Sequence, residues 1–341
     1  MSQTDSQFVP PPGSEVVNPL ARTRRSIRKL ASYAAYSGIV PPPAVFRPSG
    51  ISAIVIAKNE EEWAEASMLS VVDCVDEVVA ADHGSEDGTG EILAGIADDY
   101  PERVRLLKFT EEPFPVALNA MLVESRFRWI LRFNADFVAR TSGPHSVPQL
   151  VAELRAMDPL RYYCISLSGI ALDGDLHHQF PNRRDPFEPL AFTYSPRLRY
   201  GVKERWETLN VPWFYEKLEL PDAYYFHMRS VKSLRRMMQK LYWSHWFDAR
   251  NRGSQISLRD FVAQNAMRDW GGSTVEEAAK SYIIEEFGGC VPYSKEACGE
   301  YPDILIPALA NPPFQLIWDR GKLVDRIERH RYRPKEWKAR I

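Results

Sequence analysis

Short apolar runs alternate with segments of helical composition between residues 50 and 140. The first run, Ile51 to Ala57, is apolar almost throughout, as expected for a strand buried on both faces. The pattern predicts further strands at 76–81, 103–109 and 128–133, with helices at 59–72, 89–97 and 113–125. Strands and helices that alternate at this spacing are typical of βαβ units. We therefore expect an α/β fold with a mostly parallel sheet flanked by helices.

The pattern is less regular after residue 140. Strands are predicted at 162–170 and 223–226, whereas 173–222, which contains many Pro, Arg and aromatic residues, is expected to be loop-rich. Helices are predicted at 232–250, 258–269 and 274–287. The expected parts of the chain are a tail and basic helix at 1–48, the α/β domain at 49–230 and a helical C-terminal extension at 231–341.

The N-terminal part divides into two segments. Residues 1–18 are rich in Pro, Ser and Gln and predict a flexible tail. Residues 19–38 contain five basic residues ahead of Leu30 and Tyr33, which predicts a short basic amphipathic helix. Two interpretations stay open for this helix: it docks on the domain, or it makes peripheral contact with an anionic membrane surface.

Composition narrows the class of protein. The 341 residues are 45% hydrophobic and 26% charged, which is typical of a globular domain. The net charge of −2 gives no reason to expect a nucleic-acid partner. Four cysteines without a CxxC pair favour a reduced setting. With no apolar run near the roughly 18 residues of a membrane span and no signal-peptide pattern, we expect a cytoplasmic location, with the inner membrane face as the alternative.

Polar residues cluster directly after three of the four predicted strands. Asn59 and Glu60 follow the first strand, Asp82 follows the second, and Asn134 and Asp136 follow the fourth. Ligands of open parallel sheets bind at the carboxyl ends of the strands. A rim this acidic would bind a diphosphate only with the help of a hard cation. The sequence therefore predicts an Mg²⁺ or Mn²⁺ site there.

Three common motifs are absent. The first strand is not followed by GxGxxG, and neither GxxxxGK[ST] nor GxSxG occurs in the chain. These absences disfavour a dinucleotide-binding Rossmann site, a P-loop and an α/β-hydrolase. The loop after the first strand is acidic and has no glycine, which also disfavours a nucleotidyltransferase.

Three segments together resemble family 2 of the glycosyltransferases, the inverting enzymes with the GT-A fold. They are ISAIVIAKNEE at 51–61, VVAADHGSEDGT at 78–89 and WILRFNADF at 129–137. The resemblance implies a GT-A fold for 49–230, which would bind a nucleotide-diphosphate sugar and catalyse transfer. A looser likeness at 200–204 and 226–227 resembles bacterial members that build cell-surface sugars. It implies polysaccharide biosynthesis and a glycan, lipid-linked or small-molecule acceptor.

The resemblance assigns donor-binding roles to five residues. Asp82 would contact the base or ribose of the nucleotide, and Asp87 belongs to the same motif, with a helix N-cap as its alternative role. Asn59 and Glu60 lie in the loop that would wrap the nucleotide. Asn119, in the helix before the fourth strand, would face the nucleotide.

Further roles concern the metal and the acceptor. Asp136 matches the last acid of D-x-D, which would bind the metal, and His227 resembles a distant histidine that completes the metal shell. Asn134 replaces the first acid and brings no charge, so its donor-binding role would be a contact with the ribose or with a metal-bound water. Glu204 matches the acceptor-side glutamate expected to act as general base, with Glu207 as its rival. The replacement at position 134 keeps open a non-catalytic relative that binds sugar nucleotides in a glycan assembly complex, which a test of transfer would distinguish.

Overall fold

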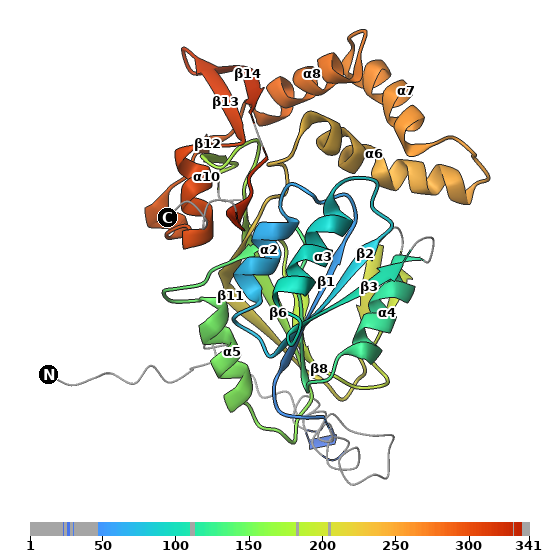
Figure 1. The fold of residues 1–341 in the computed structure, drawn as a ribbon, viewed down its shortest axis with the longest axis vertical. Helices are drawn as coiled ribbons and strands as arrows, with labels where there is room; N and C mark the ends of the chain where they lie inside the picture. Colours follow the sequence, from blue (N-terminus) through green and yellow to red (C-terminus); the bar gives the residue numbers. More distant parts are fainter. Residues whose placement is uncertain are drawn as a thin grey trace, which may run out of the picture.

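The protein is known from a computed structural model, drawn in Figure 1. It describes residues 47–109, 113–181, 184–203, 206–329 and 331–335, together with residues 23, 26–27 and 30. The predicted tail and basic helix lie almost entirely outside the described residues, so both stay predictions.

A central sheet confirms the expected α/β fold. Its strand order is β3-β2-β1-β4-β8-β6-β11-β5. The pairs β3–β2, β2–β1, β1–β4 and β6–β11 are parallel, whereas β8 and β5 pair antiparallel with their neighbours. The bounds of these strands are β1 Ile51–Ala57, β2 Glu77–His83, β3 Val104–Phe109, β4 Trp129–Arg132, β5 Phe137–Ala139, β6 Tyr163–Ala171, β8 Glu188–Thr193 and β11 Glu216–His227.

Helices cover both faces of the sheet. On one face α2, α3 and α5 pack on Ile51, Ala53 and Val55, while α4 packs on Ile54 and Ile56 on the other. Successive strand residues point to opposite faces, so an apolar strand such as β1 can contribute to both cores. The bounds of these helices are α2 Ala64–Val71, α3 Thr89–Asp99, α4 Phe114–Glu124 and α5 Val147–Ala156.

The C-terminal extension contains the predicted helices. Figure 1 shows α6, α7 and α8 as a layer beyond one end of the sheet. A hairpin, β13–β14, was not predicted and packs beside α8. The bounds are α6 Leu234–Asn251, α7 Leu258–Trp270, α8 Val275–Phe287, β12 Val291–Pro292, α9 Lys295–Cys298, a 3₁₀ turn Asp303–Leu305, α10 Ile306–Ala310, β13 Phe314–Asp319 and β14 Lys322–Glu328.

The loop-rich segment 173–222 also contains strands that were not predicted. This segment contains β7 (His178–Gln179), β8, β9 (Arg199–Lys203), β10 (Trp206–Asn210) and the first part of β11. Strand β8 lies inside the sheet between β4 and β6. Its sequence, EPLAFT, begins with a charged residue and a proline, so it shows no apolar run of the length that identified β1.

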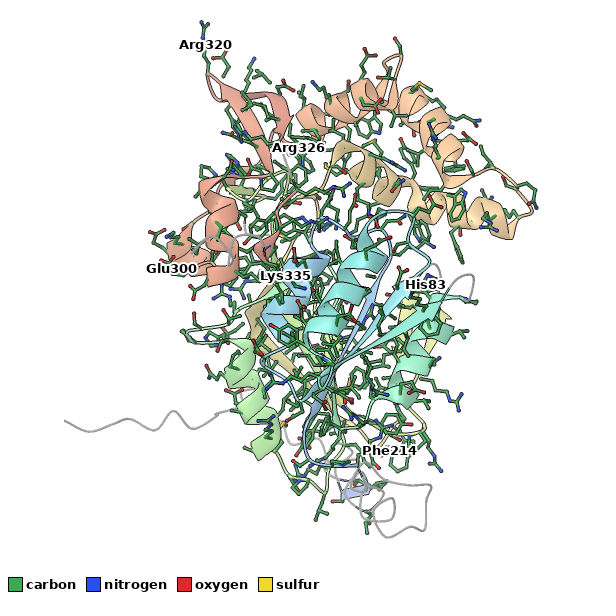
Figure 2. All side chains as sticks on the ribbon, viewed as in Figure 1. His83, Phe214, Glu300, Arg320, Arg326 and Lys335 are labelled. Carbon is green, nitrogen blue, oxygen red and sulfur yellow. The ribbon has the colours of Figure 1, made fainter. Side chains whose placement is uncertain are left out.

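Helix α6 lies at the carboxyl end of β1. The side chain of Arg236 donates a hydrogen bond of 2.8 Å to the backbone oxygen of Lys58, the residue after β1. Figure 2 shows His83, the last residue of β2, toward the helical layer and Phe214 at the opposite end of the molecule. The helical layer therefore stands over the strand ends where polar residues were predicted to gather. Within the described part of the chain, no helix is both long and apolar enough to cross a membrane.

Candidate functional site

The loops after β1 and β2 are joined to each other. Asn59 has a positive φ of 54°, a conformation that asparagine tolerates better than most residues. Its backbone N–H donates to Oγ of Ser85 at 2.9 Å, and its Oδ1 accepts from the N–H of Glu86 at 2.8 Å. The N–H of Glu60 donates to Oγ1 of Thr89 at 2.8 Å. These contacts fix the direction in which the Glu60 side chain leaves the loop.

Asp82 and Asp87 stabilise the turn after β2. Oδ1 of Asp82 accepts from the N–H of Ser85 at 3.1 Å. Oδ1 of Asp87 accepts from the N–H of Thr89 at 3.0 Å, at the start of α3. Both carboxylates thus have a local structural task, and their predicted contacts with a nucleotide stay predictions. Asp87 and Asn59 also line a cleft of about 480 Å³ beside the first turn of α6.

Glu60 and Asp136 meet through basic side chains of the extension. Nζ of Lys232 contacts Oε2 of Glu60 and lies 3.3 Å from Oδ2 of Asp136. Arg236 lies 3.0 Å from Oε1 of Glu60, and Nζ of Lys240 lies 2.6 Å from Oδ2 of Asp136. The two acids, which are 76 positions apart by their numbers, are therefore part of one charged cluster.

The electrostatics of the cluster keep its carboxyl groups ionised. Burial alone would raise the pKa of Asp136, but the charges of Lys240, Lys232 and His227 outweigh it and hold that pKa well below its ordinary value. Burial opposes ionisation of Glu60 as well, and Lys232 is the main reason why its pKa is nevertheless lowered. Each buried charge has an opposite charge in contact, as the cost of desolvation requires.

His227 bridges two carboxylates at the end of β11. Its Nε2 lies 3.3 Å from Oδ2 of Asp136, and its Nδ1 lies 3.0 Å from Oδ2 of Asp185. Burial would lower the pKa of His227, but these two carboxylates outweigh it and raise the pKa. Both ring nitrogens therefore act as donors in the protonated ring.

Two acids at this end of the sheet were missed by the sequence analysis. Asp185 and Glu188 lie in the segment 173–222 that was expected to be loop-rich, and no motif marked them. Burial raises the pKa of Glu188, and the charges of Arg132 and His227 only partly offset that effect. Glu188 therefore accepts a proton more readily than an exposed glutamate does.

Asn119 and Glu207 lie on the face of the sheet that α4 covers. Both polar side-chain atoms of Asn119 bind the backbone of Tyr200 at 2.9 Å, which joins α4 to β9. Oε1 of Glu207 lies 2.5 Å from the guanidinium of Arg132, the last residue of β4. This pair brings the β9–β10 hairpin to the end of β4. Glu204 lies outside the described residues.

The side chains present do not fit a divalent cation. In the described part of the chain, no three His, Cys, Asp or Glu side chains are grouped to hold a metal ion. Oδ2 of Asp136 is shared by two ammonium groups, one of which, that of Lys232, is fully buried. Repulsion amounts to roughly 4 kcal/mol for each pair of unit charges about 4 Å apart near a protein surface. The predicted Mg²⁺ or Mn²⁺ site, with Asp136 and His227 as ligands, stays a prediction that this donor set does not favour.

The basic partners of the cluster were also missed, although a signal for them exists. Lys232, Arg236 and Lys240 recur every four residues, and a helix was predicted over 232–250. Residues four apart lie on one face of a helix. The sequence could have shown this basic face, but not that it covers the ends of β1 and β4.

Comparison with known protein families finds a match for one part of the chain. The family model described as glycosyl transferase family 2 matches residues 52–181, which include β1, β2, β4 and their loops. No curated protein matches the chain.

Solved structures show only distant likeness. A mannosyltransferase from Pyrobaculum calidifontis in complex with GDP-Man and Mn²⁺ is 15% identical, with 86% of this chain and 89% of that chain covered and a TM-score of 0.38. TarS 1–349 of S. aureus in complex with UDP-GlcNAc is 12% identical, with 72% and 74% covered and a TM-score of 0.35. With both TM-scores below 0.5, neither structure supports a conclusion about this chain.

Proposed function

We propose that the chain, whose residues 52–181 match the glycosyl transferase family 2 model, is a nucleotide-sugar-dependent glycosyltransferase that transfers a sugar from a nucleoside-diphosphate sugar to an acceptor hydroxyl with inversion. The observation that carries this proposal is the charged cluster at the ends of β1 and β4, within and above that part of the chain. The acceptor is a hydroxyl of a glycan, a lipid-linked sugar or a small molecule.

The proposed reaction is a single displacement. The acceptor oxygen attacks the anomeric carbon, the bond from that carbon to the diphosphate breaks, and the electron pair leaves with the nucleotide. A carboxylate takes the proton of the acceptor, a contribution of about 10²–10⁴-fold in rate. Glu204 and Glu207 are the proposed bases. The Arg132 contact supports Glu207 by holding its carboxylate at the end of β4. The reaction as written uses no metal ion.

A donor screen tests the function. The full chain is incubated with UDP-, GDP-, dTDP- and CMP-sugars, and melting temperature and nucleotide release are measured. A ligand that binds only the native state raises stability, so we expect one diphosphate donor class to raise the melting temperature and to be turned over slowly. Binding without transfer or hydrolysis would instead favour the non-catalytic relative. No binding by any donor would contradict the proposal.

A variant tests the base. We expect Glu207→Gln to keep donor binding and to lower turnover by about 10²–10⁴-fold if Glu207 takes the proton. Glu124→Gln, at a half-exposed glutamate that pairs with Arg105, is the matched control and should leave turnover unchanged. Near-normal turnover of Glu207→Gln would rule out Glu207 and leave Glu204.

A further inference from the structure

Three basic residues at the start of α6 face the strand ends. Arg236 and Lys240 lie one turn apart in the helix, and Lys232 directly precedes the N-cap Ser233. All three contact the carboxylates of Glu60 or Asp136. This basic face of α6 is therefore fixed over the ends of β1 and β4, where ligands of open α/β sheets bind.

Basic side chains outnumber the carboxylates that they contact. Lys232, Arg236 and Lys240 contact two carboxylates, those of Glu60 and Asp136. A third carboxylate, that of Glu62, accepts from the N–H of Ser233 at 2.9 Å, and burial raises its pKa. Basic side chains in this position attract an anion and disfavour a further cation beside Asp136.

Lys232 and Lys240 differ in their freedom to move. The Lys232 side chain is 0% exposed and is enclosed between Glu60 and Asp136. The Lys240 side chain is 38% exposed, and its ammonium group lies 2.6 Å from Oδ2 of Asp136. Lys232 therefore fixes the positions of the two acids, and Lys240 is the more exposed of the two lysines.

We propose that Arg236 and Lys240 bind the pyrophosphate of the donor directly, while the buried Lys232 holds Glu60 and Asp136 in place, so that donor binding needs no divalent cation. The inference rests on the proposed function, because it assumes a nucleoside-diphosphate ligand. As the bond to the anomeric carbon breaks, negative charge grows on the departing diphosphate. The Lys240 ammonium stabilises that charge in place of a metal ion.

Calorimetry with UDP and GDP tests the proposal on the full chain. Each nucleotide is titrated in EDTA and, separately, in MnCl₂. We expect the better ligand to have Kd values within about twofold of each other in the two buffers. Loss of a charged hydrogen bond weakens binding by about tenfold or more, which is the effect expected for Lys240→Gln in both buffers. Lys240→Arg keeps the charge and should largely restore binding.

Lys280→Gln is the matched control. Lys280 lies on α8 and pairs with the half-exposed Asp325, so its loss should leave Kd unchanged. Binding that requires Mn²⁺, or an unchanged Kd in Lys240→Gln, would overturn the inference and leave the proposed function standing. No binding of either nucleotide in either buffer would also overturn the inference, and the donor screen decides the proposed function separately. The EDTA arm uses the unaltered protein and does not depend on the folding of a variant.

Discussion

Oδ2 of Asp136 is the atom on which the charges of the site converge. Lys240 at 2.6 Å, Lys232 at 3.3 Å and His227 at 3.3 Å all contact it. Only 5% of Asp136 is exposed, so these contacts are poorly screened by solvent. Removal of this one carboxylate would leave a fully buried ammonium group with Glu60 as its remaining partner.

Asp136→Ala is therefore expected to lower stability as well as transfer. Loss of one partner of a buried ion pair costs on the order of 3 kcal/mol in the free energy of unfolding, measured by urea denaturation. The control Asp73→Ala removes a surface pair in which Asp73 is 69% exposed, and should cost less than about 1 kcal/mol. Equal losses in the two variants would contradict the buried network.

At the scale of single residues, the sequence could predict that Glu60 and Asp136 lie in the site, but not which residues contact them. Glu60 and Asp136 stand directly after apolar strands, and the sheet rule places such residues at one edge. Lys240 is 104 residues from Asp136, and Asp185 is 42 residues from His227. No local pattern reports contacts over such separations, because they depend on how the extension packs.

Among the elements, β6, β11 and β5 set the position of Asp136 and His227. Phe137 of β5 stacks on Tyr225 of β11, with ring centroids 4.0 Å apart. The Tyr225 ring fits because Gly169 of β6 has no side chain: a Cβ atom there would overlap the ring. Because Gly169 has no Cβ atom, β11 can pack against β6 in the position that places His227 next to Asp136.

Gly169→Ala should lower the free energy of unfolding by about 1–3 kcal/mol, the usual cost of overpacking. Gly95→Ala is the opposite case. Gly95 lies in α3 with no atom within 4 Å of the added Cβ, so this variant should gain about 0.5–1 kcal/mol from helix propensity. Thermal or urea unfolding measures both. A change of the same sign in the two variants would refute the packing argument.

The elements that the sequence predicted well are those with a single, strong pattern. β1 was predicted to the residue because it is apolar apart from Ser52 and is buried on both faces. The helices α7 and α8 begin after capping residues, Ser257 and Thr274, whose side chains accept hydrogen bonds from the helix backbone. β8 was not predicted because its position in the sheet depends on pairing with β4 and β6 rather than on a pattern in its own sequence.

For the molecule as a whole, acid stability depends on a buried carboxylate far from the proposed donor site. Glu77, at the start of β2, is 0% exposed. It accepts hydrogen bonds from Ser52 at 2.5 Å and from Nε of Arg126 at 2.6 Å. Burial would raise the pKa of Glu77, but these donors outweigh it and lower the pKa.

A lowered pKa in the folded state means that Glu77 adds stability above the ordinary glutamate pKa of about 4.3, and that this stability is lost as the pH falls through the folded value. Glu77→Gln should cost on the order of 2 kcal/mol at pH 7. The difference from wild type should shrink on acidification below about pH 4. Urea unfolding at several pH values measures it. Glu124→Gln, at a glutamate 49% exposed, should show a small difference throughout.

The order of synthesis gives the contact between Lys232 and Glu60 a further consequence. These residues are 172 positions apart. While the chain emerges from the ribosome, β1, β2 and β4 are complete long before α6 appears. Until then Glu60 lacks Lys232 and Arg236, and Asp136 lacks Lys232 and Lys240. We therefore expect the charged cluster to be completed late in co-translational folding.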